Sequence, residues 1–408
     1  MRKTFSLLTF VFLIVTACGL QTASAQFPKL PKIPKPSQPK PQPTPTEPTQ
    51  PTSDSSSQPE SRNTTMSAAT NSEVYARKPE PTDTPLFLAE TLEIRTDTQD
   101  YYWKMPKESN YTSWLPHIKF NVDYGGSSRL RYKADYFMPD GSPWYSETLE
   151  QKGTGTPYLI ESEFVSDKDQ GKAIVTPGTF GLKITNMKNN EVALQGKFKV
   201  IKYKPDNTDA RYRNLVDFYV DQDWNLPIGY ADLEDWSLGA ATPLIRMWFK
   251  GGVKSEDLEA RIYHNGQQLA TTDDGGNVSS AERRFPKNAG NNPALMWNQF
   301  EFKWYNKLLF LTGPEARNQT SNRNKIYINQ SPGEYTVKVF YKGDQVRETK
   351  FTIANGEFTD NGLAKQNKIS TDKVILPVKV MGTVDKWNAA AAKTDGFYGN
   401  PLIGFTLQ

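Results

Sequence analysis

The sequence predicts an all-β protein, in which tandem antiparallel β-sandwich domains follow a signal peptide and a disordered Pro-rich linker. Three observations support this prediction. Eleven of the 29 prolines fall within residues 28–59, whereas all nine tryptophans lie beyond residue 100. Beyond residue 86, apolar residues alternate in short runs bounded by turn residues, which is typical of strands. Finally, the second half of the folded part repeats segments of the first.

Residues 1–25 have the composition of a signal peptide. Arg2 and Lys3 precede an apolar run over residues 5–15, which is shorter than the about 20 residues that a spanning helix needs. Ala23 and Ala25 form a small-x-small cleavage site. We therefore expect an exported protein that starts at Gln26 and has no transmembrane segment in its mature chain.

A second interpretation of the same region remains open. Residues 15–18 read Val-Thr-Ala-Cys, which resembles the lipobox of bacterial lipoproteins. The resemblance implies cleavage before Cys18 and lipid anchoring through its thiol. Cys18 is the single cysteine, so an intramolecular disulfide is excluded. Both interpretations predict a periplasmic, cell-surface or extracellular location.

Residues 26–85 are expected to form a disordered linker rich in Pro, Ser and Thr. Each proline fixes φ and removes an amide donor, so neither a helix nor a central strand can form there. We interpret this segment as a stalk that separates the folded part from its point of attachment.

The folded part contains an internal repeat. Residues 176–184 match residues 331–339, and in each copy a Pro-Gly pair enters a run of alternating apolar residues. A polar turn and a return strand follow, at residues 197–200 in one copy and 350–353 in the other. Each unit is therefore predicted to be a β-hairpin.

Two further segments upstream match in the same order. Residues 132–136 match 258–262, and each leads to an Asp-Gly or Asn-Gly turn. Residues 116–122 likewise match 243–249. We expect one β-sandwich over residues 86–204 and a second over residues 212–357, because each segment supplies six to eight short strands.

The Pro-Gly-x-Tyr-x-Val-x-Val pattern at residues 332–339, followed by Phe-x-Ile at 351–353, resembles the last hairpin of bacterial immunoglobulin-like and fibronectin-like domains. The resemblance implies a fold class and no activity.

Residues 358–408 are expected to be a linker and a C-terminal strand unit that resembles the start of a third repeat. Residues 401–407 again read Pro-x-Ile-x-apolar-x-apolar. A lone strand leaves its backbone groups unpaired, so this one should add to a sheet edge within its own chain or mediate self-association.

The first candidate site is a calcium loop. Asp221 and Asp223 offer oxygen ligands at alternate positions, and Asp232 lies further along. Leu226 stands where an EF-hand requires glycine, so an EF-hand is rejected and a looser calcium site or a solvated turn remains. We expect no cofactor.

The second candidate is an aromatic face that stacks on sugar rings, against the alternative that these side chains fill a core. The candidates are Trp144, Tyr145, Trp297, Trp304 and Tyr305. Nucleic acid is not expected as a partner, since nine of 49 basic residues and six of 45 acidic residues precede residue 87 and the remainder is balanced.

No local motif directs a carboxylate toward a cleft, so we expect no catalytic residues and no enzyme. The sequence favours an exported, non-catalytic binding or structural protein displayed on a Pro-rich stalk at the bacterial cell envelope, with a protein or glycan as partner. One alternative is a carbohydrate-binding protein that uses exposed aromatic residues. A second is a glycan hydrolase of unmarked class.

Overall fold

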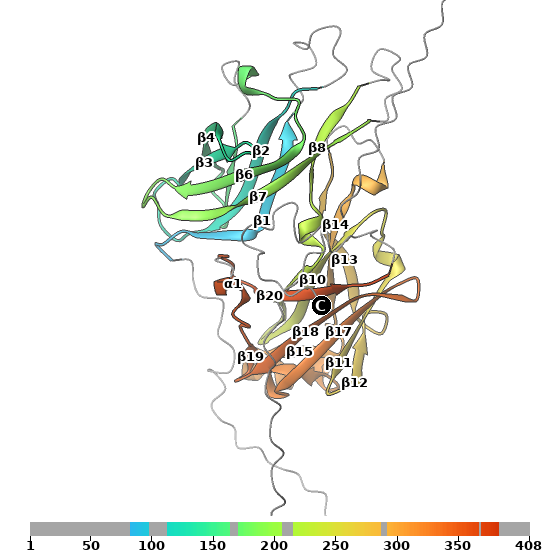
Figure 1. The fold of residues 1–408 in the computed structure, drawn as a ribbon. Coiled ribbons are helices and arrows are strands. Elements are labelled where there is room, and N and C mark those ends of the chain that lie inside the picture. The colour runs from blue at the N-terminus through green and yellow to red at the C-terminus, as the bar shows by residue number, and fades with distance from the viewer. Residues whose placement is uncertain are drawn as a thin grey trace, which may run out of the picture. The chain divides into compact units, whose positions relative to one another are not determined.

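The computed structural model describes residues 82–97, 112–163, 170–205, 215–286, 292–366 and 369–382. These residues belong to one compact unit. The predicted fold class is confirmed, since the chain forms antiparallel β-sandwiches in tandem (Figure 1). The signal peptide, Cys18, residues 26–81 of the expected linker and residues 401–407 lie outside the described residues.

The first sandwich is one antiparallel sheet with the strand order β1-β2-β5-β4-β3-β6-β7-β8. Its two ends meet, because the Thr96 hydroxyl donates to the Phe218 carbonyl at 2.7 Å. The sheet therefore folds over onto itself around one core. Its strands are β1 (Leu86–Asp97), β2 (Leu115–Asp123), β3 (Arg131–Phe137), β4 (Pro143–Lys152), β5 (Tyr158–Glu161), β6 (Gly178–Asn186), β7 (Val192–Tyr203) and β8 (Asp217–Asp221).

The second sandwich has the strand order β12-β11-β17-β18-β20-β9-β10-β14-β13. Three short strands lie beside this path: β15 (Leu308–Leu311), β16 (Ile326–Tyr327) and β19 (Glu357–Phe358). A four-residue helix, α1 (Leu363–Gln366), precedes the last strand. The remaining strands are β9 (Ile228–Ser237), β10 (Ala240–Lys250), β11 (Leu258–His264), β12 (Gln267–Thr271), β13 (Asn277–Arg284), β14 (Trp297–Lys303), β17 (Gly333–Tyr341), β18 (Asp344–Ala354) and β20 (Val374–Val380).

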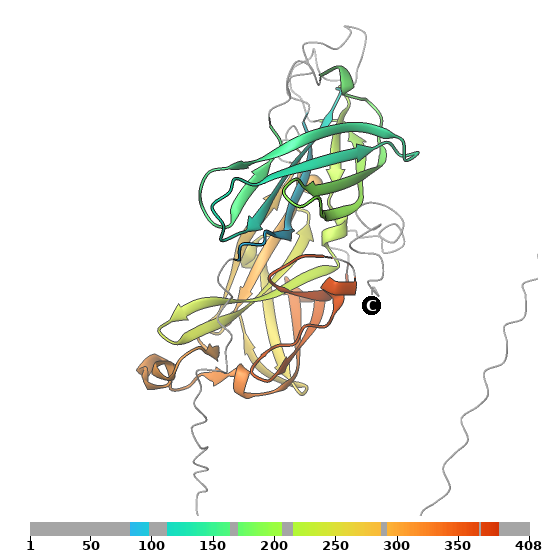
Figure 2. The same ribbon diagram turned by 90° about the vertical axis from the view of Figure 1, so that its left-hand side faces the viewer.

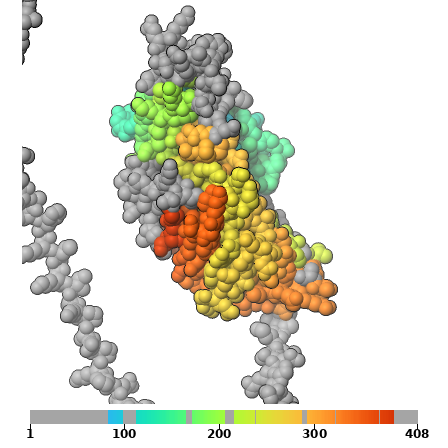
Figure 3. Space-filling model, turned by 90° about the vertical axis from the view of Figure 1, so that its right-hand side faces the viewer, coloured from blue at the N-terminus to red at the C-terminus, as the bar shows by residue number. Residues whose placement is uncertain are grey.

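The repeated hairpins form as the sequence predicts. β6 pairs with β7, and β17 pairs with β18. The turn of the second hairpin has positive φ at Lys342 and Gly343, and the turn between β11 and β12 has it at Asn265 and Gly266. Two consecutive residues of this kind give a turn whose twist matches that of the strands. Figure 3 shows the β17/β18 region, in orange, beside the yellow β11/β12 hairpin, in agreement with the β11–β17 pairing.

Strand β20 joins the two halves of the second sandwich. Its first residues, Val374 to Pro377, pair with β9, and Val378 to Val380 pair with β18. Proline suits the point of transfer, because it has no amide to donate to a ladder. The segment expected to be a linker from residue 358 thus contains a strand of the second sandwich.

The two sandwiches share a continuous apolar contact. Ile228, Tyr230 and Ile375 of the second sandwich belong to the same buried cluster as the aromatic core of the first. The connection between β8 and β9 adds polar contacts, since the Gln222 side-chain amide donates to the Ile94 carbonyl at 2.8 Å. Figure 2 shows the same arrangement from the side, with the first sandwich in blue to green and the second in yellow-green to red.

Within the described ranges, no helix has the length and apolar character that crossing a membrane requires.

Candidate functional site

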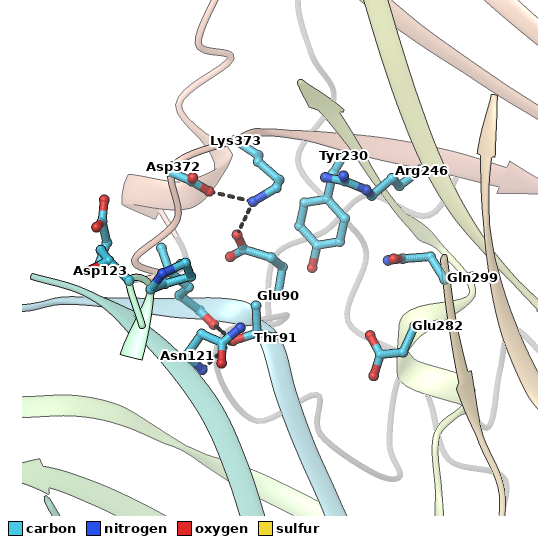
Figure 4. Close-up of a pocket in the computed structure, with 13 residues that line it drawn as sticks. Glu90, Thr91, Asn121, Asp123, Tyr230, Arg246, Glu282, Gln299, Asp372 and Lys373 are labelled. Carbon is cyan, nitrogen blue, oxygen red and sulfur yellow. Dashed lines mark hydrogen bonds and ion pairs between the residues drawn. The ribbon is translucent and has the colours of Figure 1, made fainter. Parts of the chain in front are cut away.

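A pocket of about 520 Å³ opens between β1 and β2 of the first sandwich and the outer face of β9, β10, β13 and β14 in the second. Its volume lies in the range of small-molecule sites, but its walls are far more polar than is usual for them. Figure 4 shows the side chains that line it. They are Leu88, Glu90, Thr91, Asn121, Asp123, Thr156, Pro157, Tyr230, Arg246, Glu282, Gln299, Asp372 and Lys373.

The wall from the second sandwich follows from strand alternation. In β10, Ile245 and Met247 point into the core, so Arg246 between them points outward. Arg246 lies opposite Tyr230 of β9, and Gln299 of β14 lies opposite Trp248, so both Tyr230 and Gln299 reach the same outer face. The outer face of this sheet, which solvent would otherwise cover, is thus turned toward the first sandwich.

The wall from the first sandwich depends on an irregularity in β1. Leu88 pairs with Asn121 and Glu93 with Lys119, so four residues of β1 stand opposite one residue of β2. The Thr91 hydroxyl holds this bulge, because it donates to the Leu88 carbonyl at 2.6 Å and accepts from the Asn121 amide at 2.8 Å. Bulges redirect side chains, and this one directs Glu90 toward the second sandwich (Figure 4).

The third wall is the loop before β20. The Ala89 amide donates to the Ser370 carbonyl at 3.0 Å, which fixes this loop against the bulge. The Lys373 ammonium then lies 2.7 Å from the Glu90 carboxylate and 2.6 Å from that of Asp372. Two carboxylates therefore share one cation in a site where the Glu90 side chain is only 6% exposed.

Burial raises the pKa of Glu90, and the neighbouring Asp372 adds to this effect against the opposing influence of Lys373. Burial of Lys373 opposes its charge, but the two carboxylates outweigh it and raise the pKa of Lys373. Lys373 thus stays protonated, and the raised pKa of Glu90 favours its uptake of a proton on acidification.

Several buried polar groups at the pocket have no partner within the described part of the chain. Gln299 is 6% exposed and Tyr230 is 7% exposed, and within the described residues neither the amide of the one nor the hydroxyl of the other forms a hydrogen bond, so both polar ends face the pocket. One oxygen of Glu90, Oε2, also lacks a hydrogen-bond partner. In Figure 4 the Tyr230 hydroxyl points into the space between Glu90 and Glu282. Polar groups that face a pocket without a protein partner can form hydrogen bonds to a ligand, and the buried Glu90 oxygen would also gain a partner.

The aromatic residues that the sequence singles out do not gather here. Trp297 and Trp304 are 1% and 0% exposed, so the prediction that they offer a stacking face is wrong. Tyr145 is also buried, with its ring stacked on Tyr136. Trp144 is half-buried against Trp114 at 5.2 Å, and Tyr305 is half-buried in the second sandwich. Burial of apolar rings in the two cores explains most of these positions.

Two of the calcium candidates form contacts with side chains of the protein itself. Asp223 accepts from the Lys250 ammonium and from the Trp297 indole, each at 2.8 Å. Asp232 lies 3.4 Å from the Arg246 guanidinium. Burial and the neighbouring Asp223 raise the pKa of Asp221 to about 6, which disfavours its charged form. Among the residues that the structure describes, no three His, Cys, Asp or Glu side chains could hold a metal ion.

The pocket residues themselves escape the sequence analysis. They come from β1, β2, β9, β10, β13, β14 and two loops. Apart from the neighbours Asp372 and Lys373, the charged residues of the pocket lie far apart in the sequence. A polar residue between two core positions of a strand, such as Arg246, is the single sequence signal for the pocket. The same pattern occurs on any solvent-exposed face of a sheet.

No family model matches the chain, and no curated protein matches it. Solved structures that match include two of the exo-chitosanase CsxA of Amycolatopsis orientalis, one of them a complex with PNP-β-D-glucosamine. Identity is 9%, the match covers 57% of this chain and 25% of the chitosanase, and the TM-score is 0.19. This chain therefore spans about a quarter of that enzyme's length.

A partial N-terminal region of an enterococcal surface protein also matches, with 8% identity, 69% of this chain and 95% of that chain covered, and a TM-score of 0.15. The expectation that the chain is not an enzyme is contradicted by the match to an exo-chitosanase. At these TM-scores, however, the likeness carries no argument for any particular activity.

Proposed function

We propose that this protein is an exported binding protein of the bacterial cell envelope, and that it holds a glycan in the pocket between its two sandwiches. The leading observation is that the Tyr230 hydroxyl and the Gln299 amide face the pocket and form no hydrogen bond within the described residues. Such groups can recognise a ligand that offers many hydroxyls, because each is free to form a new hydrogen bond with it.

The rest of the wall supports a glycan in particular. Sugars present hydroxyl edges and apolar C–H faces. Asn121 and Gln299 provide amide groups, while Leu88 and Pro157 provide apolar surface. Recognition by hydrogen bonds replaces the stacking on exposed aromatic rings that the sequence suggested. The Pro-rich segment and the export signal fit a protein that presents this pocket outside the cytoplasm.

The test uses two near-isosteric variants, Tyr230→Phe and Gln299→Met. Because the removed groups are unpartnered in the free protein, neither variant should lower the melting temperature. Both should weaken ligand binding by about 10-fold, the size expected for one lost hydrogen bond to a buried partner. The matched control is Tyr263→Phe, whose hydroxyl contacts Gln268 at the surface of the second sandwich.

The probes are soluble tetramers of N-acetylglucosamine, glucosamine and glucose, measured by calorimetry with the mature chain. At least one should bind and raise the melting temperature of the wild-type protein. Binding that Tyr230→Phe and Gln299→Met leave unchanged would place the ligand elsewhere. Failure of all three tetramers would contradict the glycan.

A further inference from the structure

The charges around the pocket are unevenly balanced. Each of its two lining cations is already shared by two carboxylates. Lys373 contacts Glu90 and Asp372, while the Arg246 guanidinium lies 2.9 Å from Glu301 and 3.4 Å from Asp232. Neither cation is therefore free to bind an anionic ligand. The group at Lys373 keeps a net negative charge, whereas Glu301 of the other group is also paired with Lys303 at 3.2 Å.

Two more carboxylates line the pocket. Glu282 accepts from the Arg284 guanidinium at 2.7 Å, which neutralises it. Asp123 at the end of β2 has no ion-pair partner within the described ranges. The pocket thus combines one pair of carboxylates that share a single cation with one unpaired carboxylate, and its complement is a cation.

A metal ion does not fit this excess of charge, since no cluster of three ligating side chains exists in the described part of the chain. An organic ammonium fits better, because it donates three hydrogen bonds and accepts none. The Tyr230 hydroxyl can accept one of them. Figure 4 shows this hydroxyl pointing between the carboxylates of Glu90 and Glu282, and both carboxylates act electrostatically on it.

We propose that the glycan held in this pocket carries a free primary amine. The amine lies at the Tyr230 hydroxyl, in the carboxylate-lined half of the pocket, and Asp123 on the wall from the first sandwich adds negative charge. The inference rests on the proposed function and specifies the ligand class: an amino sugar with an unblocked ammonium group. Acetylation of the amine removes its charge and adds bulk, so the pocket discriminates between the two forms.

The experiment compares the glucosamine tetramer with the N-acetylglucosamine tetramer at pH 7, where they differ in the acetyl groups. We expect the amine form to bind about 10-fold more tightly or better, as a charge-assisted hydrogen bond to a carboxylate would give. Asp123→Asn should reduce this ratio several-fold. Glu256→Gln, an exposed carboxylate in the loop before β11, is the control for net charge.

Each outcome bears on the inference separately from the proposed function. Equal binding of the two tetramers, or a ratio that Glu256→Gln lowers as much as Asp123→Asn does, overturns the amine and leaves the glycan site standing. Failure of both, with the glucose tetramer still bound, overturns the amine alone, and failure of all three overturns both proposals. Binding of trilysine in place of either tetramer would assign the pocket to a peptide and contradict the glycan in both proposals.

Discussion

The two sandwiches join their strands into a continuous path at different points. In the first, β4 pairs with β5 at Glu150–Lys152, which joins the two halves through neighbouring segments of the chain. In the second, β20 joins the halves by pairing with both β9 and β18. The comparison shows that the halves of a sandwich can be joined by different strands, and that the second sandwich depends on a strand supplied late in the chain.

The cores differ in a related way. The buried cluster of the first sandwich includes Ile228, Tyr230 and Ile375 from the second. The main cluster of the second contains no described residue from the first. Loss of packing in the first sandwich should therefore spread further than loss of packing in the second.

The strongest test of this comparison removes β20. A chain that ends at Lys373 loses Ile375, Leu376 and Val378, which are all buried. Burial of three such side chains contributes on the order of 5 kcal/mol, a large share of a domain's stability. We expect the second sandwich to unfold, which hydrogen exchange in β9 and β18 would detect. A chain that ends at Gly382 is the control, and equal protection in the two chains would show that β20 is dispensable.

Core truncation in each sandwich tests how far damage spreads. Trp114→Ala and Trp304→Ala each remove a fully buried indole and should cost about 3–5 kcal/mol. Trp114→Ala should also raise hydrogen exchange in β9 and β20, whereas Trp304→Ala should leave β1 to β7 protected. Identical exchange patterns would mean that the sandwiches unfold as one cooperative unit.

A polar contact in the first core offers a smaller test. Burial raises the pKa of Tyr136 well above its ordinary value, so its hydroxyl keeps its proton and donates to Glu147 at 2.6 Å. The matching residue of the second copy is Ile262, which needs no partner. Tyr136→Phe should cost about 1–2 kcal/mol in urea unfolding, because Glu147 loses a buried donor. No change in the midpoint would show that water replaces the hydroxyl.

The smallest effect is expected where β8 leaves the first sandwich. The folded-state pKa of Asp221 is about 6, above its unfolded value, so its ionised form destabilises the fold above pH 6 and this cost disappears as the pH falls toward 4. Asp221→Asn should stabilise the protein by on the order of 1 kcal/mol at pH 8, and should add nothing at pH 4.

The control for this pH dependence is Asp223→Asn, which loses the charge that pairs with Lys250 and should destabilise the protein at pH 8. Thermal melts of the two variants and the wild type across this pH range decide the sign. A benefit of Asp221→Asn that does not vary with pH would show that Asp221 carries no such cost.

The parts of the fold that could be predicted are those whose signal is local. The β17/β18 hairpin is one, since a turn at Lys342 and Gly343 and the alternation on both sides lie within one short stretch. β20 was not predicted as a strand, because Pro377 interrupts its pattern and its partners lie far away in sequence. Trp297 and Trp304 were misplaced because a tryptophan beside a turn looks the same in sequence whether its ring packs inward or outward.

The pocket could not be predicted for a different reason. Glu90 and Lys373 stand at opposite ends of the folded part, and the bulge that directs Glu90 is a property of the pairing between β1 and β2. Strand register and packing between the sandwiches depend on residues far away in the sequence, so the residues next to Glu90 do not reveal them.

The position of β20 also affects the order of events in a chain that emerges from its N-terminus. When β1 to β8 have appeared, the first sandwich has all of its strands and can fold. The edge of β9 that pairs with Val374 to Pro377 must wait until most of the second sandwich has been made. During synthesis or translocation this edge is an exposed template for wrong pairing, and we expect it to be where chaperones engage a nascent chain of this protein.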